Sequence, residues 1–238
     1  MPTGLPLSRR LATAARWPIG ITLTSWRYMW RTTPLHRSER AGSPADDSPP
    51  PLPPDVLADE IQWPVDGAGP LFHRTYTARV REPRRSPREL IAVLGADPDA
   101  AAPGEFATFQ KASGDEERMC VGDEFVVRMA GPWDGPVRVV DVTDTSFRLV
   151  TLAGHLEAGQ IEFSASEDED GMLLFRIESW ARSGDRLANL LYHQLRMAKE
   201  IQLHMWTSFL ERAARLAEGR LTGGVTIETR RVEEAAAP

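Results

Sequence analysis

The stretch "GPVRVVDVTDTSFRLVTLAGHLEAGQIEFSAS" (residues 135–166) decides the fold class. Its valine, leucine, isoleucine and phenylalanine residues alternate with polar residues over three short runs, and the connectors TDT and AGHLEAG are rich in turn-forming residues. Alternation with a period of two is typical of strands with one buried face, and short connectors join strands that are neighbours in space. The stretch therefore predicts an antiparallel meander.

Further strand-like stretches lie on both sides of the meander. They cover residues 71–80, 105–113, 122–130 and 172–181. Between the first two, Ser86, Pro87 and Glu89 have the spacing of a capping box with proline at the first helical position. A short helix is therefore expected over 86–98.

A long helix is expected after the last of these strands. Asp185 can cap it, and an apolar stripe that includes Leu195, Met205 and Phe209 continues toward Gly219. The apolar face of the meander is the only surface of matching size that can cover this stripe. The sequence thus predicts an α+β fold in which a curved antiparallel sheet wraps around a long C-terminal helix, a helix-grip, with an N-terminal amphipathic helical arm.

The N-terminal residues differ from the rest in charge. Residues 1–40 hold seven arginines and one acid, a net charge of +6, so the remainder carries −12 of the total of −6. An apolar stripe with interleaved arginines suits a membrane interface, a protein partner or the chain's own domain, and these alternatives stay open. The residues expected to make this contact are Trp17, Trp26, Arg27, Trp30 and Arg31.

Composition changes predict the organisation of the chain. Residues 1–41 form the basic amphipathic arm, and residues 42–70, which are rich in proline, form an extended linker. Residues 71–219 form the helix-grip domain, and residues 220–238 form a C-terminal tail.

Several classes of function find no support in the composition. The single cysteine, Cys120, excludes an internal disulfide and clustered-cysteine metal sites, and it fits a reducing compartment, so the expected location is the cytoplasm, with the arm as a peripheral membrane contact. The body is acidic and lacks a nucleic-acid-binding motif, so no nucleic-acid partner is expected. No phosphate-binding or dinucleotide-binding glycine pattern is present, and no cofactor is expected.

His155 and Glu157 are the most chemically suggestive pair. On an extended strand they would share one face, where they could contact a ligand at a cavity mouth, bind a metal with a third ligand, or act as acid and base. No third ligand is evident, and in a turn the same side chains can satisfy backbone groups instead. The structural role, the ligand contact and the catalytic role remain alternatives, and no catalytic or metal-binding residue is assigned.

Two tryptophans are further ligand-binding candidates. Trp133 and Trp180 lie at the ends of predicted strands, where an indole can close an apolar pocket while its nitrogen orients a polar group. Packing in the core is the alternative role for both.

The segment "VGDEFVVRMAGPWDGPVRVVDVTDTSFRLVTLAGHLEAGQIEF" (121–163), with "HQLRMAKEIQLHMWTSFLERA" on the long helix, resembles the DUF1990 family of bacterial and plant proteins. That family is similar to the Bet v 1-like, START-type helix-grip proteins, which enclose an apolar cavity. The resemblance implies the fold and offers no catalytic residues to transfer.

Together, these observations predict that the chain binds a small, largely apolar molecule between sheet and helix, with a membrane surface as one setting. The alternative is a non-enzymatic interaction scaffold that docks through its arm on a partner or on a second copy. Catalysis is a third possibility, for which the sequence names no mechanism.

Overall fold

The computed structural model describes residues 33–104, 107–115, 117–129, 134–184 and 196–233. Nine strands form one curved, unclosed sheet in the order β1-β9-β2-β8-β7-β6-β5-β4-β3. β1 runs parallel to β9, and the other neighbours pair antiparallel. The strands are β1 (Leu35–Ala41), β2 (Ala68–Arg81), β3 (Ala107–Ser113), β4 (Glu124–Met129), β5 (Asp134–Val142), β6 (Ser146–Thr151), β7 (Glu157–Glu167), β8 (Leu173–Ser183) and β9 (Arg220–Val232).

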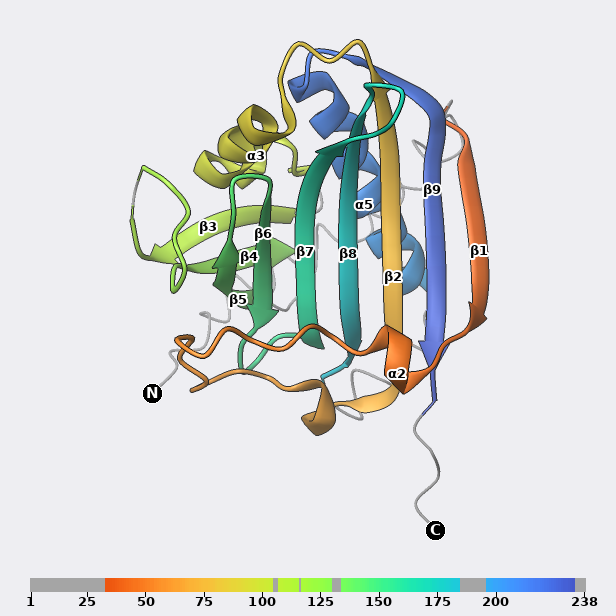
Figure 1. Cartoon of the computed structure of the whole chain (residues 1–238). Coiled ribbons are helices and arrows are strands. Elements are labelled where there is room, and N and C mark those ends of the chain that lie inside the picture. The colour runs from red at the N-terminus through yellow and green to blue at the C-terminus, as the bar shows by residue number, and fades with distance from the viewer. Residues whose placement is uncertain (1–32, 105–106, 116, 130–133, 185–195, 234–238) are drawn as a thin grey trace, which may run out of the picture.

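The helices are few, and they lie on different sides of the sheet (Figure 1). α5 (Arg196–Leu216) crosses behind β2 and β8, and α3 (Pro87–Ala96) lies near the end of β7. α2 (Pro44–Asp47) lies in front of the sheet, with the 3-10 turns η1 (Pro64–Asp66) and η2 (Pro98–Ala100) completing the described helical elements. The α+β class and the predicted meander are confirmed.

The main core fills the space between the concave face of the sheet and α5. Phe209 of α5 packs against Phe163 of β7 and Phe175 of β8, with ring centroids 5.3 Å and 6.3 Å apart. These three side chains are fully buried, and each contributes roughly 1.5–3 kcal/mol of transfer free energy. α5 is therefore fixed to the sheet at its C-terminal half by aromatic contacts.

Two parts of the predicted fold are wrong. The sheet is mixed rather than antiparallel, because β1 forms within the predicted arm and pairs parallel to β9. The long helix is not the last element, because the predicted tail at 220–238 contains β9, which pairs with β2 over Leu71–Arg81. Gly223 and Gly224 have positive φ angles of 71° and 82° and lie where the β2–β9 register shifts, so the diglycine forms a bulge inside a strand.

The predicted linker is also wrong, because most of it is bound to the sheet. Residues 43–63, which we call the strap, cross the convex face opposite α5 (Figure 1). The proline run has few N–H groups, so its carbonyls accept hydrogen bonds from sheet side chains: Gln160 donates to Pro50 O at 3.0 Å, and Arg138 donates to Leu57 O at 2.9 Å. Side-chain donors from the sheet thus replace a backbone ladder.

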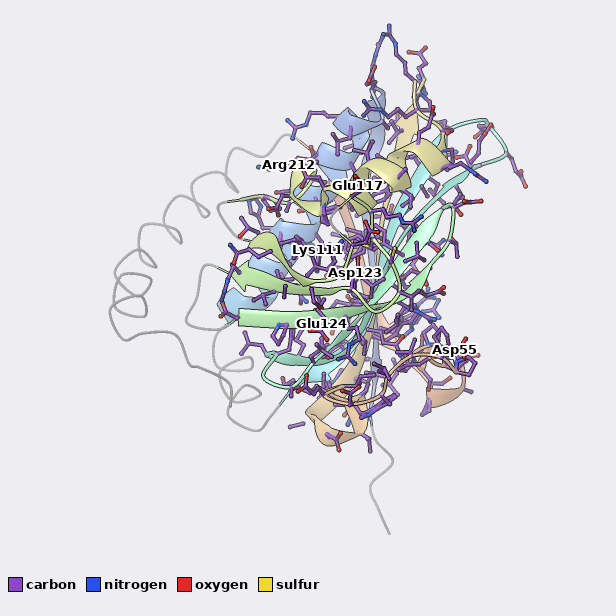
Figure 2. All side chains as sticks on the ribbon, turned by 90° about the vertical axis from the view of Figure 1, so that its left-hand side faces the viewer. Asp55, Lys111, Glu117, Asp123, Glu124 and Arg212 are labelled. Atoms are coloured by element: carbon purple, nitrogen blue, oxygen red, sulfur yellow. The ribbon has the colours of Figure 1, made fainter. Side chains whose placement is uncertain are left out.

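The far edge of the sheet holds Cys120 in a structural turn. Lys111 of β3 lies beside Asp123 (Figure 2), with Nζ and Oδ2 2.7 Å apart, and Asp123 also accepts the Cys120 N–H at 2.9 Å. The carboxylate therefore organises the turn that leads into β4.

Within the described residues, no helix is long and apolar enough to cross a membrane.

The capping box of α3 gives a first stability prediction. The Ser86 side chain accepts the Glu89 N–H, and the Glu89 carboxylate accepts the Ser86 N–H at 2.8 Å. Replacing Ser86 by alanine leaves a helix N-terminal donor without its acceptor, so we expect the free energy of unfolding to fall by about 1 kcal/mol in urea denaturation. Ser166→Ala, at an exposed serine of β7, is the matched control and should change it by less than about 0.5 kcal/mol.

Candidate functional site

A polar cluster interrupts the apolar interface between the sheet and α5. On β2, alternate residues face α5, so Arg74 shares the concave face with buried Tyr76. Arg74 is only 3% exposed, and its guanidinium lies 4.5 Å from the centroid of the Phe72 ring. A buried guanidinium with a ring beside it is an unusual feature in a core, and it marks this end of the interface as the candidate site.

An amide links this arginine to a carboxylate across the interface. Gln202 of α5 accepts from Arg74 Nη1 at 3.3 Å and donates from Nε2 to both carboxylate oxygens of Glu157, at 3.3 Å and 3.1 Å. Opposite charges are therefore connected through a neutral group that belongs to the helix. The arrangement fixes α5 over the first residue of β7 and supplies a polar end to an apolar space.

Two buried polar groups at the same interface have no hydrogen-bond partner among the described residues. They are the Ser179 hydroxyl on β8 and the Trp206 indole nitrogen on α5, in residues 4% and 7% exposed. Ser179 lies between Arg74 of β2 and Ile161 of β7, its two partners in the sheet. Two residues beyond Ile161 on β7 lies Phe163, and the centroid of its ring is 5.7 Å from that of Trp206. A buried donor without an acceptor costs about 1–3 kcal/mol, so both groups suggest a missing partner.

His155 serves the loop between β6 and β7. Its Nδ1 accepts the Glu157 N–H at 2.9 Å, and its ring packs where a Cβ on Gly135 would lie 2.9 Å from Nε2. Burial lowers the pKa of His155 to about 4, although the backbone contact at Glu157 opposes the shift. The imidazole is therefore neutral near pH 7, and one of its nitrogens is already engaged by the loop.

The strap supports the same loop from outside. Gln62 donates from Nε2 to the His155 and Glu157 carbonyls at 2.9 Å and 3.1 Å, and its Oε1 accepts the Gly154 N–H at 3.2 Å. Of the alternatives for the pair, the geometry gives His155 a structural role and places only Glu157 in the interface with α5.

Of the two roles open to Trp180, the structure supports packing and not a contact between the sheet and α5. Trp180 pairs with His73 and Gln160 on the convex face, away from α5, and it is 6% exposed. Its ring stacks on His73 with centroids 5.1 Å apart. Trp180 therefore does not line a cavity between the sheet and α5. Successive strand residues face opposite sides of a sheet, and Trp180 is an odd number of residues from Phe175 and Ile177, which face α5.

The remaining predicted contact residues lie outside the described part of the chain. They are Trp17, Trp26, Arg27, Trp30, Arg31 and Trp133.

Sequence reasoning missed four members of the cluster: Arg74, Ser179, Gln202 and Trp206. Arg74 carried a usable signal, because it occupies the same alternation as Phe72, Tyr76 and Ala78 and therefore falls on the apolar face. Ser179 likewise continues the Phe175 and Ile177 alternation. Gln202 and Trp206 are one helical turn apart, and only the packing of α5 shows that both face the sheet.

Comparison with known families confirms the predicted resemblance. Residues 100–212 match the model of DUF1990, a domain of unknown function. No curated protein matches the sequence.

Several solved structures are similar in fold at low sequence identity. Norcoclaurine synthase from Thalictrum flavum, solved with dopamine and hydroxybenzaldehyde, is 10% identical with a TM-score of 0.46, covering 71% of this chain and 96% of that one. Protein Ms6760 from Mycobacterium smegmatis is 16% identical with a TM-score of 0.41, covering 71% and 98%. A conserved protein from Geobacillus kaustophilus is 11% identical with a TM-score of 0.44, covering 63% and 98%.

Proposed function

We propose that this chain, with its DUF1990 domain at residues 100–212, binds a small, largely apolar molecule between the sheet and α5. The observation that carries the proposal is the Trp206 indole nitrogen, a buried donor inside an aromatic interface that has no acceptor in the described part of the chain. A ligand atom that accepts this N–H would remove the cost of leaving the donor unpaired.

The surrounding groups support a ligand of mixed character. Phe163 and Phe209 offer an apolar surface, whereas Ser179 offers a hydroxyl that can donate or accept. An apolar body that carries one hydroxyl or carbonyl oxygen would match both kinds of group. Arg74 and Glu157 are already linked through Gln202, so a neutral oxygen suits this environment better than an ionised head.

The arrangement favours binding over proton transfer. Gln202 hydrogen-bonds to both the guanidinium and the carboxylate, and an amide side chain does not act as an acid or a base near pH 7. His155 is neutral, and its Nδ1 is occupied by the Glu157 N–H. The residues at the site thus support recognition of a polar atom by fixed hydrogen-bonding groups.

Native mass spectrometry of the full-length protein, followed by organic extraction, tests the proposal. A reproducible adduct of discrete mass that extraction releases would support it. The uncharged fluorescent probe N-phenylnaphthylamine provides a second measurement on the extracted protein. Absence of both an adduct and saturable probe binding would overturn the proposal.

Trp206→Phe provides a matched variant, because it keeps an aromatic ring and removes the N–H. We expect the affinity for decanol, measured by displacement of N-phenylnaphthylamine, to be about five to ten times lower in the variant, because one hydrogen bond is lost. The affinity for decane, which has no oxygen, should change little. Trp180→Phe on the convex face is the control and should leave both affinities unchanged. Equal losses for decanol and decane would show that Trp206 acts only through packing.

A further inference from the structure

A second cluster of charged side chains lies on the convex face, where the strap begins. His73 of β2 has Nδ1 2.7 Å from Asp47 Oδ1 and Nε2 2.6 Å from Glu178 Oε1. Asp47 belongs to α2 and Glu178 to β8, so one imidazole joins the strap to the sheet. The His73 side chain is 10% exposed and that of Asp47 3%, which places this junction largely out of solvent.

With both carboxyl groups ionised, the two short contacts require a protonated ring. A neutral imidazole donates from one nitrogen, whereas the imidazolium donates from both, and carboxylates only accept. Burial acts to lower the pKa of His73, but the hydrogen bonds to Glu178 and Asp47 outweigh it and raise the pKa above its ordinary value of 6.5. The pKa of Asp47 is lowered, because hydrogen bonds from His73, Ser43 and Arg230 outweigh the opposing effect of burial.

The charged groups around the cluster come from the neighbouring strands. Arg230 of β9 donates to Asp47 Oδ1 at 3.1 Å, and Arg176 of β8 lies 3.8 Å from Glu178. Glu162 of β7 pairs directly with Glu178, and its pKa is raised by burial first and then by the nearby carboxylates, with the arginines opposing. Farther along, Arg40 of β1 pairs with Glu228 of β9 at 3.3 Å.

Loss of the His73 proton would therefore leave carboxylates facing one another with fewer cations. Asp47 would keep Arg230, but among the cations that the structure describes Glu178 would keep the distant contact with Arg176, beside Glu162. One of the two hydrogen bonds from the ring would also be lost. Both effects weaken the contact between α2 and the sheet.

We propose that His73 is a pH-sensitive latch that holds the first part of the strap, residues 43–49, against the convex face and releases it when the imidazolium is deprotonated. Release is confined to this part because the strap has separate anchors farther on. Arg138 donates to the Leu57 and Asp59 carbonyls at 2.9 Å and 3.0 Å, and Gln62 N–H donates to Thr151 O at 2.9 Å.

The direction of the pH effect follows from the sign of the shift. In the latched state the pKa of His73 lies above the value of 6.5 for a free histidine. The latch therefore contributes fully below about pH 6.5, and its contribution is lost as the pH rises through the raised pKa. Each unit by which the latched pKa exceeds the released one changes the ratio of closed to open forms about tenfold.

Hydrogen–deuterium exchange of the full-length protein tests the latch. Two backbone amides report on α2. The Ser43 N–H donates to Asp47 Oδ2 at 2.8 Å, and the Asp47 N–H donates to Ser43 O at 2.9 Å. After correction for intrinsic exchange rates, we expect their protection to fall between pH 6 and pH 9.5, by about tenfold for each unit by which the latched pKa exceeds the released one. Amides of β7 and β8 should keep theirs.

Two variants separate the latch from general pH effects. Glu178→Gln leaves the strap intact and removes one carboxylate, so the loss of protection should occur at lower pH, with the NMR titration of the His73 ring shifted equally. His73→Gln should give low protection of α2 at every pH. His36→Gln, at an exposed histidine of β1, should behave as the wild type. The proposal is overturned if protection of α2 is independent of pH, or if the His73 ring titrates at or below pH 6.5.

Discussion

Replacing Arg138 by alanine is expected to lower the free energy of unfolding by about 2–3 kcal/mol, because it removes a buried cation that donates to a carboxylate on β4 and to two carbonyls of the strap. Arg138 donates from Nε and Nη2 to Glu124 Oε1 at 3.0 Å and 2.7 Å. Its remaining nitrogen, Nη1, binds the carbonyls of Leu57 and Asp59 in the strap. One guanidinium thus connects β5, β4 and the strap.

Urea denaturation of Arg138→Ala beside Arg148→Ala measures this effect. The two side chains are 6% and 7% exposed on adjacent strands of the same face, so they are matched in burial. Among the described residues, the hydrogen bonds of Arg148 are long, at 3.4 Å to Pro51 O and 3.5 Å to Asp141, and its Nε has no partner there. Its loss should cost clearly less. Equal losses for the two variants would show that burial of the aliphatic stem, and not the hydrogen bonds to the strap, sets the cost.

The elements predicted correctly are those whose two faces differ in environment. β5, β6, β7 and β8 turn one face toward the main core, so their sequences alternate and can be located by period. α3 was located because Ser86, Pro87 and Glu89 specify a helix start independently of any tertiary contact. Local chemistry and one-sided burial were sufficient for this part of the fold.

The strap and the edge strands could not be found in the same way. The strap has no periodicity, because it binds through carbonyls to donors such as Arg138 and Gln160 that lie far along the chain. β1 is almost wholly exposed and charged, and β9 contains Gly223 and Gly224, which are typical of a linker unless a partner strand accommodates a bulge. Non-local pairing determines these elements, and a single sequence carries little signal of it.

Acidification is expected to destabilise the protein through His155 by up to about 3 kcal/mol between pH 6.5 and pH 4. Burial lowers the pKa of His155 from the ordinary 6.5 to about 4, with the backbone contact at Glu157 acting in the opposite direction. Below pH 6.5 the unfolded chain binds a proton that the folded chain excludes. The contribution of His155 is therefore fully present above pH 6.5 and is lost as the pH falls toward the folded pKa.

His155→Asn isolates this contribution, because the asparagine Oδ1 can take the place of Nδ1 as acceptor of the Glu157 N–H. Other carboxylates also titrate in this range, so the relevant quantity is the difference between the unfolding free energies of variant and wild type at each pH. That difference should shift in favour of the variant as the pH falls from 6.5 to 4. His36→Asn, at an exposed histidine, should show no such trend. A pH-independent difference for His155→Asn would mean that the folded loop admits the imidazolium, and His155 would then return as a candidate proton donor beside Glu157.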